Sequence, residues 1–352
     1  SRIRKNYRKN DEGKIIMALN KTNRFNGVTS IYKDNISNNL LLGAQDFFSW
    51  GFLNIGAFQN ITKSPDLSGS YPSSFSRSRL RSSDDPSYEE GQVWEGFRND
   101  WVWESGFSYN DSKPIQVSGI WINNFFYGSG DYTYSHFVDY PNGRVIFDNP
   151  ISPNSIVNAN FSHRTVGVAL ASERFIQELM YDSYDIETLG QYQMSSSGTR
   201  NQLGERRLQL PLVALELSRS NQRSGYQLGG GQLAYNDVLF HVFADNEFEK
   251  NNIKDVILAQ DEKVFYLVNR GLMSENKKYP FQLDSNGSAV KNSKNYADLV
   301  TPSGDGGFRG KQTRINKMIC SDMEPVNSWL HRATIRATFE VVAGLDANLG
   351  NI

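Results

Sequence analysis

Cysteine is nearly absent from this chain, which has one cysteine in 352 residues. Cys320 alone cannot form an intramolecular disulfide, and a zinc site built on several cysteines is excluded with it. Long apolar runs are also missing, because no segment approaches the ~20 consecutive apolar residues that a membrane-spanning helix needs. The sequence therefore predicts no disulfide framework, no cysteine-based zinc centre and no contact with a membrane interior.

An excess of charge of one sign is lacking as well. The 37 basic and 38 acidic residues leave a formal net charge of −1. Such a chain has no global positive field to hold nucleic acid or an anionic membrane. Hydrophobic residues make up only 38% of the chain, yet aromatic residues reach 12%. We expect a β-rich protein with long loops and two or three domains.

The first 35 residues are polar and predict an N-terminal arm with at most one short strand, over residues 14–19. Its start is basic, with Arg2, Arg4 and Arg8, but no apolar stretch with a cleavage site follows, so a secretory signal is not expected. Three interpretations stay open: a mobile arm, a strand that pairs with a neighbouring molecule, and a contact with a local anion.

Residues 36–90 combine a helix with a long loop. Apolar residues from Leu40 to Ile55 recur at helical spacing and predict a helix over about 38–54. Gly43 and Gly51 weaken it, since each costs about 1 kcal/mol relative to alanine inside a helix. Residues 62–91 mix small polar residues, charges and proline, and they predict a solvated loop.

From residue 91 to about residue 170 the apolar period falls to two, which is typical of strands. Asn142-Gly143 predicts a hairpin turn, and Pro141 ends the strand before it. This spacing predicts a central all-β sandwich or barrel module over 91–170. The expected strands are 92–104, 115–127, 136–140, 144–148, 155–162 and 165–170.

After a short helix and linker over 171–205, residues 206–352 predict an α+β domain with a mixed sheet and flanking helices. Two long strands, 208–218 and 233–244, enclose a glycine-rich bend. A helix follows, with Asp245 as its N-cap and an apolar stripe from Ile253 to Val268. A long polar loop over 274–310 and strands at 313–320 and 331–342 complete the domain.

Patterns that carry catalysis are missing. The chain has no Gly-x-Ser-x-Gly turn, and its four histidines are scattered. Glu95 and Glu104 would lie ~30 Å apart along one extended strand, too far for a glycosidase pair. Gly229–Gly231 lies between two strands, which does not suit a phosphate cradle. We expect a protein that is not an enzyme and binds no cofactor, although a hydrolase with carboxylates assembled from distant residues stays open.

Tryptophans are concentrated in the β-rich segment, at Trp101, Trp103 and Trp121 among others. Indole rings combine a large apolar area with one hydrogen-bond donor, which favours them at interfaces. Three interpretations stay open for these rings: a hydrophobic core, a protein interface, and a stacking platform for sugars.

The order from residue 208 onward resembles the small α+β domain of tail terminator (tail completion) proteins of tailed bacteriophages. The segments that carry the resemblance are 210–217, 237–244 with the helix after it, and 333–342. Residues 117–124 and 139–148 look like β-rich modules of phage virion and neck proteins. The chain is more than twice the usual terminator length, so the helix at 38–54 would belong to the terminator-like domain and the β module would be an insertion.

The resemblance implies a ring, usually sixfold, that caps the tail tube and joins it to the head connector. The expected protein is thus a structural component of the virion neck or tail end, assembled in the host cytoplasm. Its expected partners are further copies of itself in a hexamer, a tail tube or sheath protein, a head–tail connector protein, and passing DNA through non-specific contacts. The alternative is a carbohydrate- or receptor-binding β module of a tail fibre or baseplate.

Open sheet edges and long loops are what neighbouring subunits need for strand pairing, and they guide the choice of candidate residues. The candidate assembly interface consists of Arg2, Arg4, Arg8, Trp101, Trp103, Trp121, Tyr226, Gly229, Gly230 and Gly231. The candidate loop facing the lumen of the ring carries Lys277, Lys278, Lys291, Lys294, Arg309 and Lys311.

Overall fold

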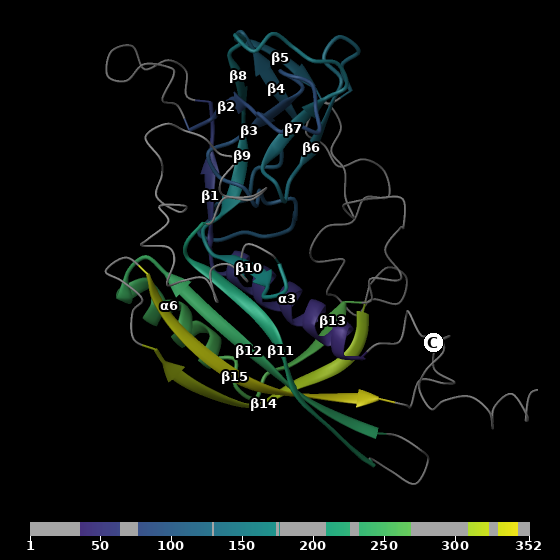
Figure 1. The fold of residues 1–352 in the computed structure, drawn as a ribbon, viewed down its shortest axis with the longest axis vertical. Helices are drawn as coiled ribbons and strands as arrows, with labels where there is room; N and C mark the ends of the chain where they lie inside the picture. Colours follow the sequence, from purple (N-terminus) through teal and green to yellow (C-terminus); the bar gives the residue numbers. More distant parts are fainter. Residues whose placement is uncertain are drawn as a thin grey trace, which may run out of the picture.

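The computed structural model describes residues 36–63, 77–128, 130–173, 176, 209–225, 232–268, 309–323 and 330–343. Its strands form one seven-stranded, one six-stranded and one two-stranded sheet. Figure 1 shows the seven-stranded sheet as a curled layer at the top of the picture, with the six-stranded sheet and both described helices below it. The protein is therefore of the α+β class, as the sequence predicts.

The six-stranded sheet runs in the order β10-β11-β12-β15-β14-β13. β10 is parallel to β11 and every other neighbouring pair is antiparallel, which confirms the expected mixed sheet. The strands are β10 (Gly167–Leu170), β11 (Leu212–Gly225), β12 (Gln232–Ala244), β13 (Val264–Val268), β14 (Arg309–Asp322) and β15 (His331–Ala343).

Helices α3 (Ile36–Asn54) and α6 (Glu247–Leu258) cover one face of this sheet. The odd-numbered residues of β15 from 333 to 341 are buried under them, whereas the even-numbered ones are half-buried or exposed. Phe48 of α3 meets Phe240 of β12 edge-on, with ring centroids 4.7 Å apart. Neither described helix is long and apolar enough to cross a membrane.

The seven-stranded sheet runs in the order β5-β4-β8-β2-β3-β7-β6. β5 and β6 stand at its two ends among the described strands, so the expected β-rich module is present as one curled sheet that these strands do not close. Trp101 and Phe161 stack inside the curl with ring centroids 4.2 Å apart, and both are fully buried. The strands are β2 (Arg79–Ser82), β3 (Val93–Glu95), β4 (Gly119–Ile122), β5 (Phe125–Gly128), β6 (His136–Asp139), β7 (Arg144–Phe147) and β8 (Val157–Ala159).

A short antiparallel ladder of β1 (Phe58–Ile61) and β9 (Phe161–Arg164) runs between the two larger sheets in Figure 1. Strands β2–β9 therefore follow α3 in the chain and precede β10. α3 packs on the six-stranded sheet, and β10 is a strand of that sheet. The strands of the curled sheet therefore lie, along the chain, between two elements that belong to the six-stranded sheet and its helical cover.

Several sequence expectations are confirmed. The helix expected at 38–54 is α3, and the expected hairpin around Asn142-Gly143 is β6–β7. Gly143 adopts the positive φ of 61° that its turn requires. The two long strands on either side of the glycine-rich bend are β11 and β12, which pair in antiparallel register.

The solvated loop expected over residues 62–91 is wrong in part, because β2 lies inside it. β2 pairs with both β3 and β8 and thus occupies the middle of the curled sheet. Leu80 is its one buried apolar side chain, at 1% exposure. A strand of four residues with one apolar member, set among arginine and serine, has too little periodicity to be recognised from sequence.

The strand expected over 92–104 is also wrong, since β3 ends at Glu95. Asp100 has a φ of 55°, which breaks an extended conformation, and Trp101 forms only an isolated bridge to His163. Glu95 and Glu104 therefore do not lie along one strand, and the separation inferred from an extended chain does not apply. The strand expected over 115–127 is likewise two strands, β4 and β5, joined by a turn.

The helix expected to carry an apolar stripe to Val268 ends at Leu258, and its N-cap is Asn246 in place of Asp245. The distal part of that stripe belongs to β13, where Phe265 and Leu267 are buried. Strand β10, expected in the β module, pairs with β11 of the other sheet. The expected helix near 172–181 and the expected strand at 14–19 lie outside the described residues apart from 172, 173 and 176.

Two glycines of α3, Gly43 and Gly51, differ in the space around them, and this difference can be tested. A Cβ on Gly43 would lie 2.5 Å from Leu267 Cδ2, whereas a Cβ on Gly51 would meet nothing within 4 Å. We expect Gly43→Ala to lower the free energy of unfolding by about 1–3 kcal/mol through overpacking. Gly51→Ala should raise it by about 0.5–1 kcal/mol through helix propensity. Urea unfolding measures both, and equal effects at the two sites would contradict the packing.

Candidate functional site

A cleft of about 400 Å³ lies where α3, the curled sheet and the β10–β11 end of the six-stranded sheet meet. Gln45, Asp46 and Ser49 of α3 form one wall. The segment from Arg98 to Glu104, which follows β3, forms another. The third wall has two parts. One consists of residues of β10 together with Glu173, and the other of residues 209–212 at the start of β11.

α3 is held between the two layers and so positions this cleft. Its Phe48 and Leu40 face the core of the six-stranded sheet, whereas Trp50 and Leu53 belong to a separate cluster with residues of the β-rich segment. A helix that buries apolar residues all round is a core helix. The cleft therefore lies at a packed junction.

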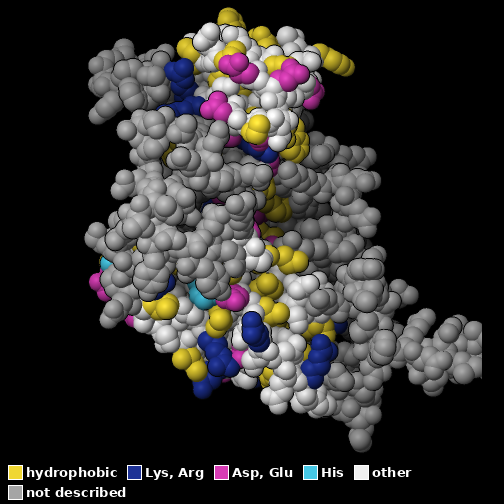
Figure 2. All heavy atoms as spheres, in the orientation of Figure 1, with side chains coloured by type: hydrophobic (Ala, Val, Ile, Leu, Met, Phe, Trp, Pro, Cys, Tyr) yellow, Lys and Arg dark blue, Asp and Glu magenta, His cyan; other side chains and the backbone are white. Residues whose placement is uncertain are grey.

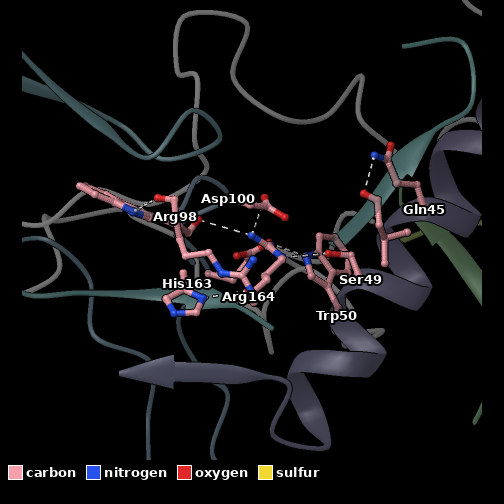
Figure 3. A network of polar contacts seen from close by, with 10 residues as sticks. Gln45, Ser49, Trp50, Arg98, Asp100, His163 and Arg164 are labelled. Carbon is pink, nitrogen blue, oxygen red and sulfur yellow. Dashed lines mark hydrogen bonds and ion pairs between the residues drawn. The ribbon is translucent and has the colours of Figure 1, made fainter. Parts of the chain in front are cut away.

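Arg164 and Glu104, which both line the cleft, form a buried ion pair. Figure 3 shows Arg164 between Asp100 and the α3 residues Ser49 and Trp50. The same guanidinium reaches Asp100 Oδ1 at 3.3 Å and donates to the hydroxyl of Ser49 at 3.2 Å. Trp50 donates its indole N–H to Glu104 Oε1 at 3.0 Å. One arginine at the end of β9 thus connects a loop of the curled sheet to helix α3.

Glu104 is 1% exposed, and its Oε2 has no hydrogen-bond partner among the described residues. Burial raises the pKa of Glu104, while the charge of Arg164 acts to lower it. Burial acts to lower the pKa of Arg164, but its carboxylate partners hold that pKa above its ordinary value. Oε1 of Glu104 is held by Arg164 and Trp50, whereas Oε2 is a buried acceptor without a donor among the described residues. Such an acceptor costs about 1–3 kcal/mol.

Arg98, also at the cleft, is half-buried, and burial lowers its pKa. Glu249, Asp100 and Asp245 act in the opposite direction on this pKa, and Arg77 adds to the lowering. Burial raises the pKa of Glu249 itself, and its hydrogen bond with Asp245 adds to that rise. The start of α6 therefore contributes negative potential to the same region as the cleft.

The edges of both sheets are the second feature with functional meaning. Only residues 212–215 of β11 pair with β10, although β11 extends to Gly225. The outer edge of β11 beyond residue 215 has no partner strand among the described residues. The side chains of residues 219–223 are exposed, and Figure 1 shows the β11–β12 hairpin projecting beyond the body of the protein.

Aromatic side chains are exposed at the hairpin of β4 and β5. Phe125 is 69% exposed and Phe126 45%, and β5 is an end strand of its sheet. Trp121 lies beside Phe126, with ring centroids 4.9 Å apart, and Lys63 Nζ lies 5.7 Å from the indole centroid. Figure 2 shows hydrophobic side chains at the top of the molecule, where this hairpin lies.

The face of the six-stranded sheet away from the helices is polar around His241 and Asp237, whereas its β10–β11 end carries a buried apolar cluster that includes Leu212, Ala214 and Phe243. His241 Nε2 lies 3.0 Å from Glu216 Oε2, and the Thr334 hydroxyl lies 3.3 Å from His241 Nδ1. Asp237 accepts a hydrogen bond from Thr338 at 2.7 Å and pairs with Arg336. Figure 2 shows charges of both signs over this sheet. These side chains satisfy one another across strands, which is how a solvent-facing sheet surface is stabilised.

The structure describes only some of the candidate interface residues. Trp101 is 0% exposed, so its inclusion in an assembly interface is wrong for the single chain: it is a core residue. Trp103 is half-buried at the cleft, and Trp121 is half-buried near the exposed aromatic hairpin. Outside the described residues lie Arg2, Arg4, Arg8, Tyr226, Gly229, Gly230 and Gly231.

The candidate lumen-facing loop also needs a correction at its end. Arg309 is the first residue of β14 and pairs with Val268, and Lys311 lies in the same strand, so neither is a loop residue. Lys277, Lys278, Lys291 and Lys294 lie outside the described residues.

The network around Arg164 escaped sequence reasoning, because Arg164 and Glu104 are 60 residues apart and join through tertiary packing. A weak signal existed, since an arginine between two predicted strands needs a partner when it is buried. Within the described part of the chain, no group of three His, Cys, Asp or Glu residues is placed to hold a metal ion.

Comparison with known proteins assigns no family to this chain. No protein-family model matches it, and no curated protein is similar to it in sequence. The functional argument therefore depends on the geometry and on the sequence resemblance described above.

Replacing Glu104 tests the buried ion pair. Glu104→Gln leaves the Arg164 guanidinium buried with only part of its charge compensated, and breaking such a pair costs about 3–5 kcal/mol. We expect a loss of that size in the free energy of unfolding, measured by urea denaturation. Glu262→Gln, which removes the exposed partner of Arg314, is the matched control and should leave the unfolding midpoint nearly unchanged. Similar losses in both variants would contradict the central role of the buried pair.

Buried histidines make stability depend on pH. Burial lowers the pKa of His163 and His136 from the ordinary value of 6.5. As the pH falls below about 6.5, these histidines take up protons in the unfolded chain before they do so in the folded chain. The free energy of unfolding therefore decreases with falling pH, by up to about 1.4 kcal/mol per pH unit for each histidine. Urea unfolding at several pH values between 7.5 and 5.5 should show this slope, and His163→Gln with His136→Gln should flatten it. A slope unchanged in the double variant would contradict the assignment.

Proposed function

We propose that this chain is a structural protein of a tailed-bacteriophage virion, assembled with copies of itself into a ring at the neck or head-proximal end of the tail. In that role it would cap the tail tube and join it to the head connector. The observation that carries the proposal is the outer edge of β11. Its residues after 215 are extended, project from the body and pair on one side only among the described strands.

An open strand edge offers unpaired N–H and C=O groups to another chain. Residues 216–225 would span ~30 Å at the usual rise per residue, which is longer than a typical strand. Their side chains contribute little burial to their own fold, because most of them are exposed. A neighbouring subunit that pairs with this edge would account for a strand so much longer than the protein's own core requires.

The element order supports the proposal in kind. β11, β12, α6, β14 and β15 follow one another as in the segments that resemble tail terminator proteins. β13 at the other edge of the sheet has exposed Val264 and Tyr266. Two different edges on one sheet allow head-to-tail contacts, which close into rings when the rotation between subunits permits. A near-zero net charge lets copies approach without strong repulsion.

A receptor-binding or carbohydrate-binding module is the second candidate. The exposed pair Phe125 and Phe126, next to Trp121, favours it, because exposed aromatic clusters mark contact surfaces. Binding to a glycan that is lost in Trp121→Ala, together with a chain that stays monomeric, would decide for this candidate.

Two adjacent proline variants test the ring. Along β11 successive backbone N–H groups point in opposite directions, so of Gln222 and Arg223 one N–H faces β12 and the other faces the open edge. Gln222→Pro and Arg223→Pro are therefore matched: one breaks the hairpin, and the other removes only a donor for a neighbouring chain.

Native mass spectrometry should show the wild-type chain forming one closed oligomer, a hexamer according to the resemblance. We expect the proline variant that keeps wild-type stability to lose this oligomer, and the other variant to lose stability. A wild-type chain that remains monomeric up to high micromolar concentration, with and without a tail tube protein, would contradict the proposal.

A further inference from the structure

Aromatic and basic side chains share one row on the outer face of the curled sheet. One residue from each of β5, β4, β8 and β2 lies directly opposite the next in the antiparallel register, in the order Phe126, Trp121, Asn158 and Arg79. Residues directly opposite one another project to the same face. The residues next to three of them along the chain are buried in the core of the curl: Ile122, Val157 and Leu80. Because neighbours along a strand point to opposite faces, the row faces away from that core.

The row begins with an aromatic platform. Phe126 is 45% exposed, and its ring lies across Gly119, where a Cβ would come within 2.7 Å of Phe126 Cζ. Trp121 lies beside this ring on the next strand. The face of an aromatic ring carries partial negative charge, so it attracts the slightly positive C–H groups of a sugar ring. This end of the row therefore suits a pyranose.

Basic side chains flank the platform. Strands β5, β4, β8 and β2 contain Arg79 and Arg81 and no acidic residue. Glu95 of β3 lies opposite Arg81, whereas Arg79 forms no ion pair with a described residue. Lys63 Nζ lies over the indole ring and donates only to an amide oxygen, which leaves its charge uncompensated. Figure 2 shows Lys and Arg side chains together at the upper left, where β2 lies in Figure 1.

Amide groups around the row add hydrogen-bond donors. Asn124 accepts a bond from Lys63 Nζ through Oδ1, and Asn160 accepts one from the backbone N–H of Lys63 in the same way. Asn158 accepts through Oδ1 from the hydroxyl of Ser78. The Nδ2 groups of these three amides have no acceptor among the described residues. Since each Nδ2 carries two donors, the surface is rich in donors, and its ligand should be rich in acceptor oxygens.

We propose that this row binds an acidic saccharide, with a sugar ring against Phe126 and its carboxylate paired with Arg79 and Lys63. A guanidinium group donates two parallel hydrogen bonds to a carboxylate, which makes such pairing strong and specific. The four strands span ~14 Å, which accommodates a short oligosaccharide. This inference names the ligand class of the carbohydrate-binding candidate and rests on that candidate, whereas it does not require the ring.

The charge pattern favours an acidic saccharide over two other ligands. A neutral sugar would gain nothing from the uncompensated charges of Arg79 and Lys63. A nucleic acid strand would need a longer basic track, because its affinity depends on neutralising many phosphates. The next strand, β3, instead carries Glu95, and the whole chain has a net charge of −1. Two cations beside one platform match a ligand with few negative charges.

Matched acidic and neutral oligosaccharides test the ligand class on the full chain. Tetragalacturonate and its full methyl ester have the same sugar rings and differ in charge. We expect the acidic member to bind about tenfold more tightly in isothermal titration calorimetry, because only its carboxylates form charge-assisted hydrogen bonds. High salt should reduce this preference, since it screens charges at the surface. A glycan array of other acidic and neutral sugars covers ligands that this pair misses.

Variants of the row locate the binding. Replacing both Arg79 and Lys63 by glutamine should make the acidic and neutral members bind equally, whereas Arg79→Lys keeps the charge and should keep most of the preference. Phe126→Ala should weaken the binding of both members, because the platform serves either one. Arg219→Gln removes an exposed arginine of β11 and is the matched control, which should change nothing. Urea unfolding midpoints check that each variant is folded.

Each of the other outcomes overturns the inference in a different way. Equal binding of acidic and neutral sugars by the wild-type chain would overturn it and leave the carbohydrate-binding candidate standing. An acidic preference that survives the loss of Arg79 and Lys63 would place the ligand elsewhere. Tighter binding of an oligothymidylate than of every acidic sugar would assign this face to nucleic acid. Binding to no sugar at all would overturn both the inference and the carbohydrate-binding candidate, while native mass spectrometry would still decide the ring.

Discussion

The buried guanidinium of Arg164 is the interaction on which the arrangement of the two larger sheets depends. Arg164 ends β9 and reaches both a carboxylate beyond β3 and a hydroxyl on α3, so it connects the curled sheet to the helix that covers the other sheet. Around it, Trp50 and Leu53 of α3 pack against Val102 and Phe107. The apolar contacts supply the attraction, and the charges fix which side chains must meet.

This junction has a consequence for function. A charge network that is paired only where two layers meet makes their relative position specific, because a shifted arrangement would leave a buried charge without a partner. The projecting β11–β12 hairpin is continuous with this junction, since β11 begins at the cleft. An assembly contact made by the hairpin would therefore be held in a defined direction relative to the curled sheet.

Sequence periodicity succeeded where one element buries one face over many residues. α3 and the long strands β11, β12 and β15 show a repeat that persists for several turns or alternations, whereas the short β6–β7 hairpin was indicated by its Asn142-Gly143 turn. It failed for β2 and β13, which are four and five residues long. In the case of β13, Val264 and Leu267 lie at helical spacing and continued the stripe of α6, whereas the buried residues are Phe265 and Leu267, two positions apart. A run of five mainly apolar residues fits either period, so its sequence does not tell a strand from a helical turn.

The chain's composition and patterning alone determined the α+β class, the lack of disulfides and the near balance of charge, because each of these follows from local residue choice. Tertiary structure alone decided that Trp101 is a core residue, that Arg164 meets Glu104, and that four carboxylates surround one cleft. Those facts join residues far apart in the sequence. A contact across such a distance is set by how whole elements pack, and no local pattern encodes it.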